Sequence, residues 1–397
     1  MILSRSMANR FACAVRSAFA LIVTGGFVVA AVGAAVGAAV GAPVGAQGVA
    51  PSAPLPRTGT FLMGSYTDKI YVIDEATLAI RDSIRLSIGI PADLLLSDDW
   101  SRLYVMNPQH DRVEIVDIAT RRVTGGFTLN TPGTSAAIWG MNVDPKERYA
   151  MVVVKSTTKK LDRYEVSPPM LLRYDFAKQA VTDTVPWPAG EERDFAQIIF
   201  SPAGDLMYFF TSDDVLVYDA ATLKQVDRWE LSRSFYEEGM GRINAGFGSD
   251  IFEEPGFYTN LFRTVDPVNH RQMMGVARVD LAKRTVDFYT LGPSVSTGFR
   301  LAPGKRMAYG IHSEVGNYQF WTFDLENRRV VGKTEFAGRS RMGLTVGSTG
   351  EFLYVHTAGN TIDVYEVGTF KKLRTATFEV DMTDIMLVPP RPAGAGR

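Results

Sequence analysis

Cysteine is almost absent from this 397-residue chain, which limits the chemistry that it can carry. The one cysteine, Cys13, stands ahead of an apolar stretch that we predict to be removed, and it is not placed like the lipid-bearing cysteine of a lipoprotein. A mature chain without thiols forms no disulfide, no thiolate metal site, no thioether link to haem and no cysteine-derived quinone. Redox groups of these kinds would have to be carried by another chain.

Histidine is scarce too, and the common catalytic motifs are missing. The four histidines show no H-x-x-x-H spacing or similar metal-ligand pattern. No G-x-S-x-G nucleophile motif is present, and adjacent acids such as Glu253 and Glu254 point apart in an extended segment. The 42 basic and 43 acidic residues nearly balance, which argues against nucleic acid as a partner. We therefore predict no catalytic residue, cofactor site or metal site on this chain.

The N-terminal segment predicts secretion. Arg5, Arg10 and Arg16 precede a charge-free run of Ala, Val and Gly that ends in Val44-Gly45-Ala46, so we expect residues 1–46 to be a signal peptide and the protein to be periplasmic. After cleavage no membrane contact is expected. The alternative is a retained transmembrane anchor, because the run exceeds about 20 residues and its glycines follow small-xxx-small spacing.

One phrase recurs along the rest of the chain. In "VLVYDAATLKQVDRWEL" (Val215 to Leu231) an apolar run ends in an acid, small and basic residues follow, and a second β-rich run begins. Seven such units are marked by acids spaced 43, 58, 44, 61, 44 and 42 residues apart. The acids are Asp74, Asp117, Asp175, Asp219, Asp280, Asp324 and Glu366. Repeats of this length without helical periodicity predict blades of four short strands, A to D.

We expect each of the seven acids to accept hydrogen bonds from amides two or three residues on, and so to form the turn between strands C and D. This structural role is favoured over metal binding or catalysis. The predicted fold is all-β, a seven-bladed β-propeller of four-stranded antiparallel blades.

The chain ends predict how the ring closes. The first unit has strands B, C and D but no strand A, whereas Asp384 to Pro390 is a spare strand after the seventh unit. We expect this C-terminal strand to join blade one, which would remove a free sheet edge. The propeller would span residues 58–390, between a flexible N-terminal segment, 47–57, and a flexible tail, 391–397.

Three insertions lengthen the repeat, and all are predicted on the side of the ring that carries the B-to-C and D-to-A connections. They are Lys155 to Pro169, Ser232 to Gly246 and Arg263 to Gln272. Long loops gather where recognition occurs. The aromatic residues assigned to this side are candidates for a partner or pocket interface: Tyr164, Phe235, Tyr236, Phe257 and Tyr258. The alternative is that these rings only pack between blades.

Several segments carry a family resemblance. "FSPAGDLMYFF" and "DAATLKQV" look like YVTN-type propellers of secreted bacterial proteins. More specific are "KLDRYEVSPPMLLRYD" (Lys160 to Asp175), "GFYTNLFRTVDP" (Gly256 to Pro267) and "MAYGIHSEVGNYQFWTFDLENRRVV" (Met307 to Val331). In this order they resemble the β subunit of quinohemoprotein amine dehydrogenase, a periplasmic seven-bladed propeller.

The resemblance implies a structural subunit of a hetero-oligomeric oxidoreductase. A small subunit would bear a tryptophylquinone, a dihaem cytochrome subunit with c-type haem would take the electrons, and a primary amine would be oxidised to its aldehyde. Phe257, Tyr258 and Thr259 are the leading candidates for touching the quinone-bearing subunit. The stretch "EEGMGRINAGFGSDIFEEPG" has no counterpart that we can place, which leaves open a paralogue with a different partner.

Two alternatives remain open. One is a stand-alone secreted YVTN-type propeller that binds a protein or surface ligand, favoured by the generic turn motifs. The other is a propeller lyase or lactonase, which would need a cluster of acids binding Ca²⁺ at the central channel.

Overall fold

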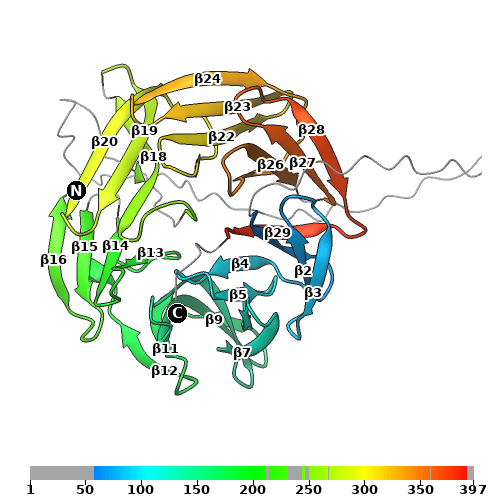
Figure 1. Cartoon of the computed structure of the whole chain (residues 1–397). Coiled ribbons are helices and arrows are strands. Elements are labelled where there is room, and N and C mark those ends of the chain that lie inside the picture. The colour runs from blue at the N-terminus through cyan, green and yellow to red at the C-terminus, as the bar shows by residue number, and fades with distance from the viewer. Residues whose placement is uncertain are drawn as a thin grey trace, which may run out of the picture. The chain divides into compact units, whose positions relative to one another are not determined.

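The computed structural model describes residues 58–211, 214–230, 244–245, 250–266, 268–357 and 359–390. These residues form seven antiparallel sheets that follow one another around a ring (Figure 1). Each sheet is one blade, with its strands in the order A, B, C, D from the inside of the ring to the outside. The predicted seven-bladed β-propeller is confirmed.

Each blade contributes one strand of every kind, in the order of blades one to seven. Strands A are β29 (Met382–Val388), β4 (Asp93–Leu96), β8 (Thr134–Val143), β13 (Gln197–Phe200), β17 (Asn244–Ala245), β21 (Arg300–Leu301) and β25 (Met342–Val346). Strands B are β1 (Thr60–Ser65), β5 (Arg102–Met106), β9 (Tyr149–Lys159), β14 (Leu206–Phe210), β18 (Phe257–Asp266), β22 (Met307–Glu314) and β26 (Phe352–Thr357).

Strands C are β2 (Lys69–Asp74), β6 (Arg112–Asp117), β11 (Met170–Asp175), β15 (Asp214–Asp219), β19 (Arg271–Asp280), β23 (Asn317–Asp324) and β27 (Thr361–Glu366). Strands D are β3 (Ile80–Arg85), β7 (Arg122–Thr128), β12 (Ala180–Val185), β16 (Gln225–Glu230), β20 (Thr285–Pro293), β24 (Arg329–Glu335) and β28 (Lys372–Thr377). Blade three has one more strand, β10 (Tyr164–Val166), and a 3₁₀ turn, Pro188–Gly190, follows β12.

The recurring acid builds the turn between strands C and D, as predicted. In six blades its carboxylate accepts the backbone N–H three residues on, at 2.7 to 3.0 Å. In blade seven Glu366 instead accepts the hydroxyl of Thr369 at 2.6 Å. The residue four positions after each acid has a left-handed φ of 52° to 59°, although it is never glycine. These side-chain hydrogen bonds support a turn that non-glycine residues otherwise adopt at some cost.

The ring closes through the C-terminal strand. β29 pairs with β1 antiparallel, with Thr60 opposite Val388, so blade one takes its strand A from the end of the chain. The sheet order β29-β1-β2-β3 confirms the predicted closure, although the strand begins at Met382, two residues earlier than expected. Blade one therefore depends on two segments more than 300 residues apart in the sequence.

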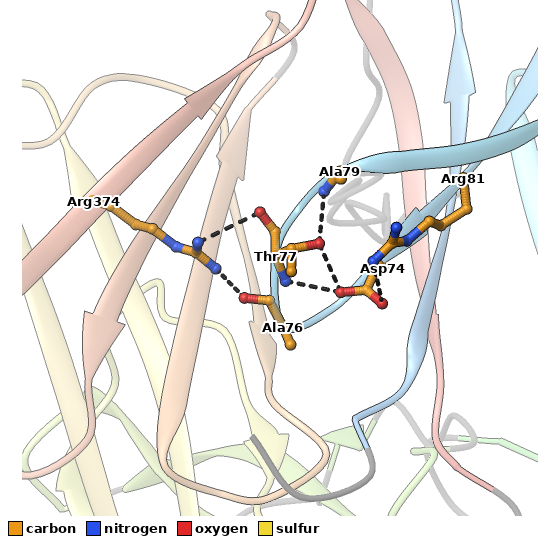
Figure 2. A network of polar contacts seen from close by, with 6 residues as sticks. All are labelled: Asp74, Ala76, Thr77, Ala79, Arg81 and Arg374. Atoms are coloured by element: carbon orange, nitrogen blue, oxygen red, sulfur yellow. Dashed lines mark hydrogen bonds and ion pairs between the residues drawn. The ribbon is translucent and has the colours of Figure 1, made fainter. Parts of the chain in front are cut away.

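Arginines connect the outer strands of neighbouring blades. At three seams the left-handed turn residue is an arginine that pairs with an aspartate in strand D of the preceding blade, at 2.8 to 2.9 Å. At the closing seam, between blades seven and one, the left-handed turn residue of blade one is Leu78. The arginine at this seam lies in blade seven instead. Arg374 in β28 donates to the carbonyls of Ala76 and Thr77, while Asp74 holds the same turn (Figure 2).

The hydrophobic core lies between the blades. Each cluster of buried side chains draws on two neighbouring sheets, as where Met151 and Val153 of β9 pack with Phe200 and Phe209 of blade four. At the closing seam the ring of Phe61 meets that of Tyr354 edge to face, with centroids 4.9 Å apart. Packing of this kind makes every blade depend on both neighbours. No helix among the residues described has the length and apolar character to cross a membrane.

Two insertions have more structure than the sequence suggested. The blade-three insertion is a hairpin in which β10 pairs with the end of β9. The blade-five insertion extends β18 and β19, which pair residue for residue from Phe257 to Asp266. The predicted C-terminal end of the third insertion, Ser232 to Gly246, was wrong. Asn244 and Ala245 belong to strand A of blade five instead. The predicted leader, residues 1–46, and the tail, 391–397, lie outside the described residues.

Candidate functional site

The two sides of the ring differ, and we call the side with the B-to-C and D-to-A connections the B–C face. The opposite side, with the A-to-B and C-to-D turns, is the A–B face. Tyr164 lies on the B–C face as predicted, in β10, and its side chain is 68% exposed. Phe235 and Tyr236 lie outside the described residues.

Phe257, Tyr258 and Thr259 lie at the A–B face, so the prediction that Phe257 and Tyr258 lie on the B–C face was wrong. They begin strand B of blade five, and Phe257 is opposite Asp280, the turn acid of that blade. The insertion lengthens the C-terminal end of β18, at the B–C face. The N-terminal end of the strand stays at the A–B face, as in the other strands B. Their contact with a partner stays a prediction.

All three residues are held by their own blade and its neighbour. The guanidinium carbon of Arg278 lies 4.4 Å from the ring centroid of Phe257. Tyr258 packs in the core between blades four and five, and burial raises the pKa of its hydroxyl. Thr259 is only 7% exposed. These contacts match the alternative interpretation for aromatic residues, in which the rings pack between blades.

Exposed apolar side chains are distributed unevenly over the described residues. Six of the large ones lie on strands D, one in each blade except blade five: Ile80, Val123, Val181, Val226, Val331 and Leu373. Eight of the other nine lie on or next to B-to-C and D-to-A connections, and the ninth, Trp139, lies inside β8. The nine are Tyr66, Trp139, Leu161, Tyr164, Val166, Phe195, Val265, Val268 and Val315. We call these nine the apolar set of the B–C face. Exposed apolar groups collected on one side mark a surface for interaction.

Three aromatic members of this set, Tyr66, Trp139 and Phe195, were not predicted. Trp139 is the extra residue of a bulge in β8, between Ile138 and Gly140, and it is 55% exposed. A bulge turns its extra side chain away from the regular pleat. Phe195, 61% exposed, lies two residues before strand A of blade four, which begins at Gln197.

Trp139 and Phe195 are joined through a small polar cluster. The ammonium of Lys155 lies 5.9 Å from the ring centroid of Trp139 and 2.6 Å from a carboxylate oxygen of Asp194. Gly140 leaves room for the neighbouring ring, because a Cβ there would lie 3.2 Å from Phe195. The run of charges ahead of Phe195, "EERD", was the available sign that this segment is a connection rather than a buried strand.

Titratable groups near the inner strands have partners of their own. His110 forms an ion pair with Asp93 at 3.0 Å, and this hydrogen bond raises the pKa of His110. Burial raises the pKa of Asp384, which accepts the N–H of Leu94 at 3.4 Å. Burial lowers the pKa of His356 to about 4. Across the described ranges no three His, Asp or Glu side chains are arranged to hold a metal ion.

Comparisons with known proteins identify the fold. No protein-family model matches the chain, and no curated protein matches it. A functionally unknown protein from Desulfotomaculum acetoxidans matches with a TM-score of 0.51 and 15% identity, over 84% of this chain and 100% of that one. At such identity the match shows the fold alone.

Two further solved structures match more weakly. Dihydro-heme d1 dehydrogenase NirN has a TM-score of 0.49 and 11% identity, over 85% of this chain and 77% of that one. The Pseudomonas aeruginosa periplasmic gluconolactonase has a TM-score of 0.45 and 14% identity, over 84% and 99%.

Proposed function

We propose that the chain is the non-catalytic propeller subunit of a periplasmic amine dehydrogenase of the quinohemoprotein type. It is a scaffold that holds a quinone-bearing small subunit and a dihaem cytochrome subunit. The amine is oxidised on the small subunit, and the electrons leave through the haems, so this chain supplies binding surface rather than reacting groups.

The segments that carry the family resemblance support this proposal by their place in the fold. Lys160 to Asp175 covers β10 and β11, and Gly256 to Pro267 covers β18. Both segments belong to the two lengthened B-to-C hairpins. The third segment, Met307 to Val331, covers β22 and β23 of blade six, which has no insertion. Two of the three segments therefore lie where the chain departs from a minimal propeller, and such departures are where function is usually added to a common fold.

The apolar set of the B–C face is the observation that carries the proposal. Nine of the exposed large apolar side chains of the described residues lie toward this side of the ring, and such a grouping favours an interaction surface. In a complex these groups are covered, and aromatic residues such as Trp139 and Phe195 are the typical anchors of such contacts. The scaffold's partners therefore bind on the B–C face.

Purification from the native source tests the proposal. A tagged copy of the chain is expected to bring down a small chain with a covalently built quinone and a chain with two covalently bound haems. Mass spectrometry of the small chain and haem staining of the other identify them, and a tagged unrelated periplasmic protein controls for carry-over. A monomer without either chain would contradict the proposal and would favour the stand-alone propeller.

A further inference from the structure

His110 connects the inner strands of blades two and three. It lies in the B-to-C connection of blade two, between β5 and β6. Its carbonyl oxygen accepts the backbone N–H of Ile138 in β8 at 2.8 Å, and its ring atom Nδ1 lies 3.3 Å from the carbonyl oxygen of the same residue. One residue of blade two therefore takes both backbone groups of Ile138, at the inner edge of blade three.

These contacts lie beside the bulge that exposes Trp139. The register of β8 with β9 shifts between Ile138 and Gly140, so Trp139 has no residue opposite it on β9. A bulge disrupts the ladder locally, so contacts from outside the sheet help to fix its backbone. Here the backbone N–H of Ile138 turns to His110. The conformation of the bulge, and with it the place of the Trp139 ring, therefore depends on His110.

Both nitrogens of the His110 ring face an oxygen atom. Nε2 lies 3.0 Å from a carboxylate oxygen of Asp93, at the start of β4, and Nδ1 faces the carbonyl oxygen of Ile138. A carbonyl oxygen and an ionised carboxylate only accept hydrogen bonds, whereas a neutral imidazole has one N–H to donate. Both hydrogen bonds therefore exist together only when the ring carries two protons. The site fits the imidazolium form.

Loss of one proton is expected to break the contact with Ile138 rather than the contact with Asp93. The hydrogen bond to Asp93 is shorter, and a charged acceptor binds a donor more strongly than a neutral one. The neutral ring therefore keeps its proton on Nε2. The lone pair of Nδ1 then faces the carbonyl oxygen of Ile138, and two acceptors repel each other. The bulge loses one of its two hydrogen bonds to blade two.

Other charged groups surround this pair. They are Asp384 on β29, Asp111 and Arg112 after the turn, and Lys155 with its partner Asp194 beside Trp139. Burial raises the pKa of Asp384, and the charge of Asp93 adds to this effect. The carboxylate of Asp111 accepts two side-chain amides at 2.7 and 2.8 Å. Among the residues described, the carboxylate in ion-pair contact with His110 is that of Asp93.

We propose that His110 is a proton-operated clasp: as an imidazolium it ties blade two to the bulge that presents Trp139, and as a neutral ring it releases the bulge. The hydrogen bond with Asp93 raises the pKa of His110 above its ordinary value of 6.5. The clasp is therefore closed below about pH 6.5, and it opens as the pH rises through the folded-state pKa. Because Trp139 belongs to the apolar set of the B–C face, the pH sets how that surface is presented. This regulation is a property of the chain alone and goes beyond the proposed function.

The test replaces His110 by a residue that donates at every pH. In His110→Asn the side-chain amide stands where Nδ1 stood and can donate to the carbonyl of Ile138 without titrating. Asparagine also tolerates the left-handed φ of 54° at this position. Asp93 is half exposed, so water replaces its lost partner. The matched control is His270→Asn, because His270 is exposed and has a left-handed φ of 52° at the tip of the blade-five hairpin.

Hydrogen exchange at the amide of Ile138 is measured at pH 5.5, 7 and 8.5, relative to the rate in an unstructured peptide. At pH 5.5 the wild type and His110→Asn should be protected equally. At pH 8.5 the wild type is expected to exchange at least about fivefold faster than His110→Asn, and His270→Asn should follow the wild type. In an NMR titration the ring of His110 should have a midpoint above 6.5.

A second variant, Asp93→Asn, gives an independent result. Its amide can donate to an unprotonated Nε2, so the neutral ring of His110 can keep its proton on Nδ1. The amide of Ile138 should then stay protected at pH 8.5, although the midpoint of His110 falls because the carboxylate charge is gone.

Two results would overturn the clasp. One is that the wild type, with His110 deprotonated, protects the amide of Ile138 as well as His110→Asn and Asp93→Asn do. The other is a midpoint of His110 at or below 6.5 in the wild type. No partner enters these measurements, so their failure leaves the proposed function as it stands.

Discussion

The carboxylate of Glu75 accepts two hydrogen bonds from Ser348, which lies 273 residues further along the chain. The backbone N–H of Ser348 donates at 2.8 Å and its hydroxyl at 2.5 Å. The N–H of Gly59 donates to the same carboxylate at 2.5 Å, and Glu75 is only 1% exposed. One buried side chain thus joins the first strand of the ring to the last blade.

Glu75 stands where the other blades have an apolar residue. The position directly after the recurring acid is Ile118, Phe176, Ala220, Leu281, Leu325 or Val367 in the six other units. Blade one is the only blade whose strands B, C and D do not follow the preceding blade in the sequence. It is also the only blade in which a carboxylate takes the place of this apolar residue. The sequence shows that Glu75 differs from the residues at the equivalent positions. Its role in closing the ring follows only from its hydrogen bonds with Ser348.

We predict that Glu75→Ala opens this seam. The substitution removes the acceptor of three hydrogen bonds in a buried place, which is expected to cost about 2 to 4 kcal/mol of unfolding free energy. Glu75→Gln keeps one acceptor oxygen and should lose about half as much. Urea titration measures both.

Glu326→Ala is the matched control, because Glu326 pairs with Arg306 on the surface. Its effect is expected to stay below about 1 kcal/mol, as for exposed ion pairs in general. Equal effects of Glu75→Ala and Glu326→Ala would contradict a role of Glu75 in closure.

A second prediction concerns the outer part of the same seam (Figure 2). Arg374 donates to uncharged carbonyl groups, whereas Asp82, at the equivalent position of strand D in blade one, forms an ion pair with Arg121. Salt screens exposed charge pairs more than hydrogen bonds to carbonyls. The fall in melting temperature on Asp82→Ala should shrink between low and high NaCl, while that on Arg374→Ala should change little. The opposite pattern would mean that Arg374 acts through charge.

The third prediction is a pH effect from His356. Its pKa of about 4 lies below the ordinary value near 6.5, so the unfolded chain binds a proton in this range that the folded chain does not. Stability from this group is therefore complete above about pH 6.5, falls as the pH drops, and levels off below about pH 4. The wild type should lose up to about 1 kcal/mol per pH unit more than His356→Gln across this window.

Urea titrations at pH 7, 5.5 and 4.5 measure this difference. The variant is suitable because the imidazole of His356 fills the space beside Gly343 and contacts the hydroxyl of Thr345 at 3.3 Å, and glutamine is no larger. Parallel pH curves for the two proteins would show that His356 titrates as in the unfolded chain.

How far the sequence predicts this protein depends on whether the signal is local. Each turn acid is recognised from the residues around it, and the missing strand A of the first unit is found by counting strands. These two signals were enough to predict the fold and its closure. The place of Phe257 did not, because it depends on which end of a strand an insertion lengthens. Trp139 was missed because its exposure comes from a bulge, which the pairing of β8 with β9 creates. Strand register is set by the whole blade, not by the neighbouring residues.

The last prediction tests whether the apolar set of the B–C face binds a partner. Trp139→Ser removes a large exposed ring from this face, and Val331→Ser removes an exposed side chain from strand D of blade six. Neither residue is in the buried core, so both variants should fold. Because aromatic anchors dominate protein interfaces, Trp139→Ser is expected to weaken binding of the quinone-bearing subunit by about thirtyfold, or about 2 kcal/mol. Val331→Ser should bind within twofold of the wild type in the same titration, since strands D lie on the outside of the ring. Equal weakening by both variants would place the contact on the outer strands instead, and no effect of either would exclude Trp139 as an anchor.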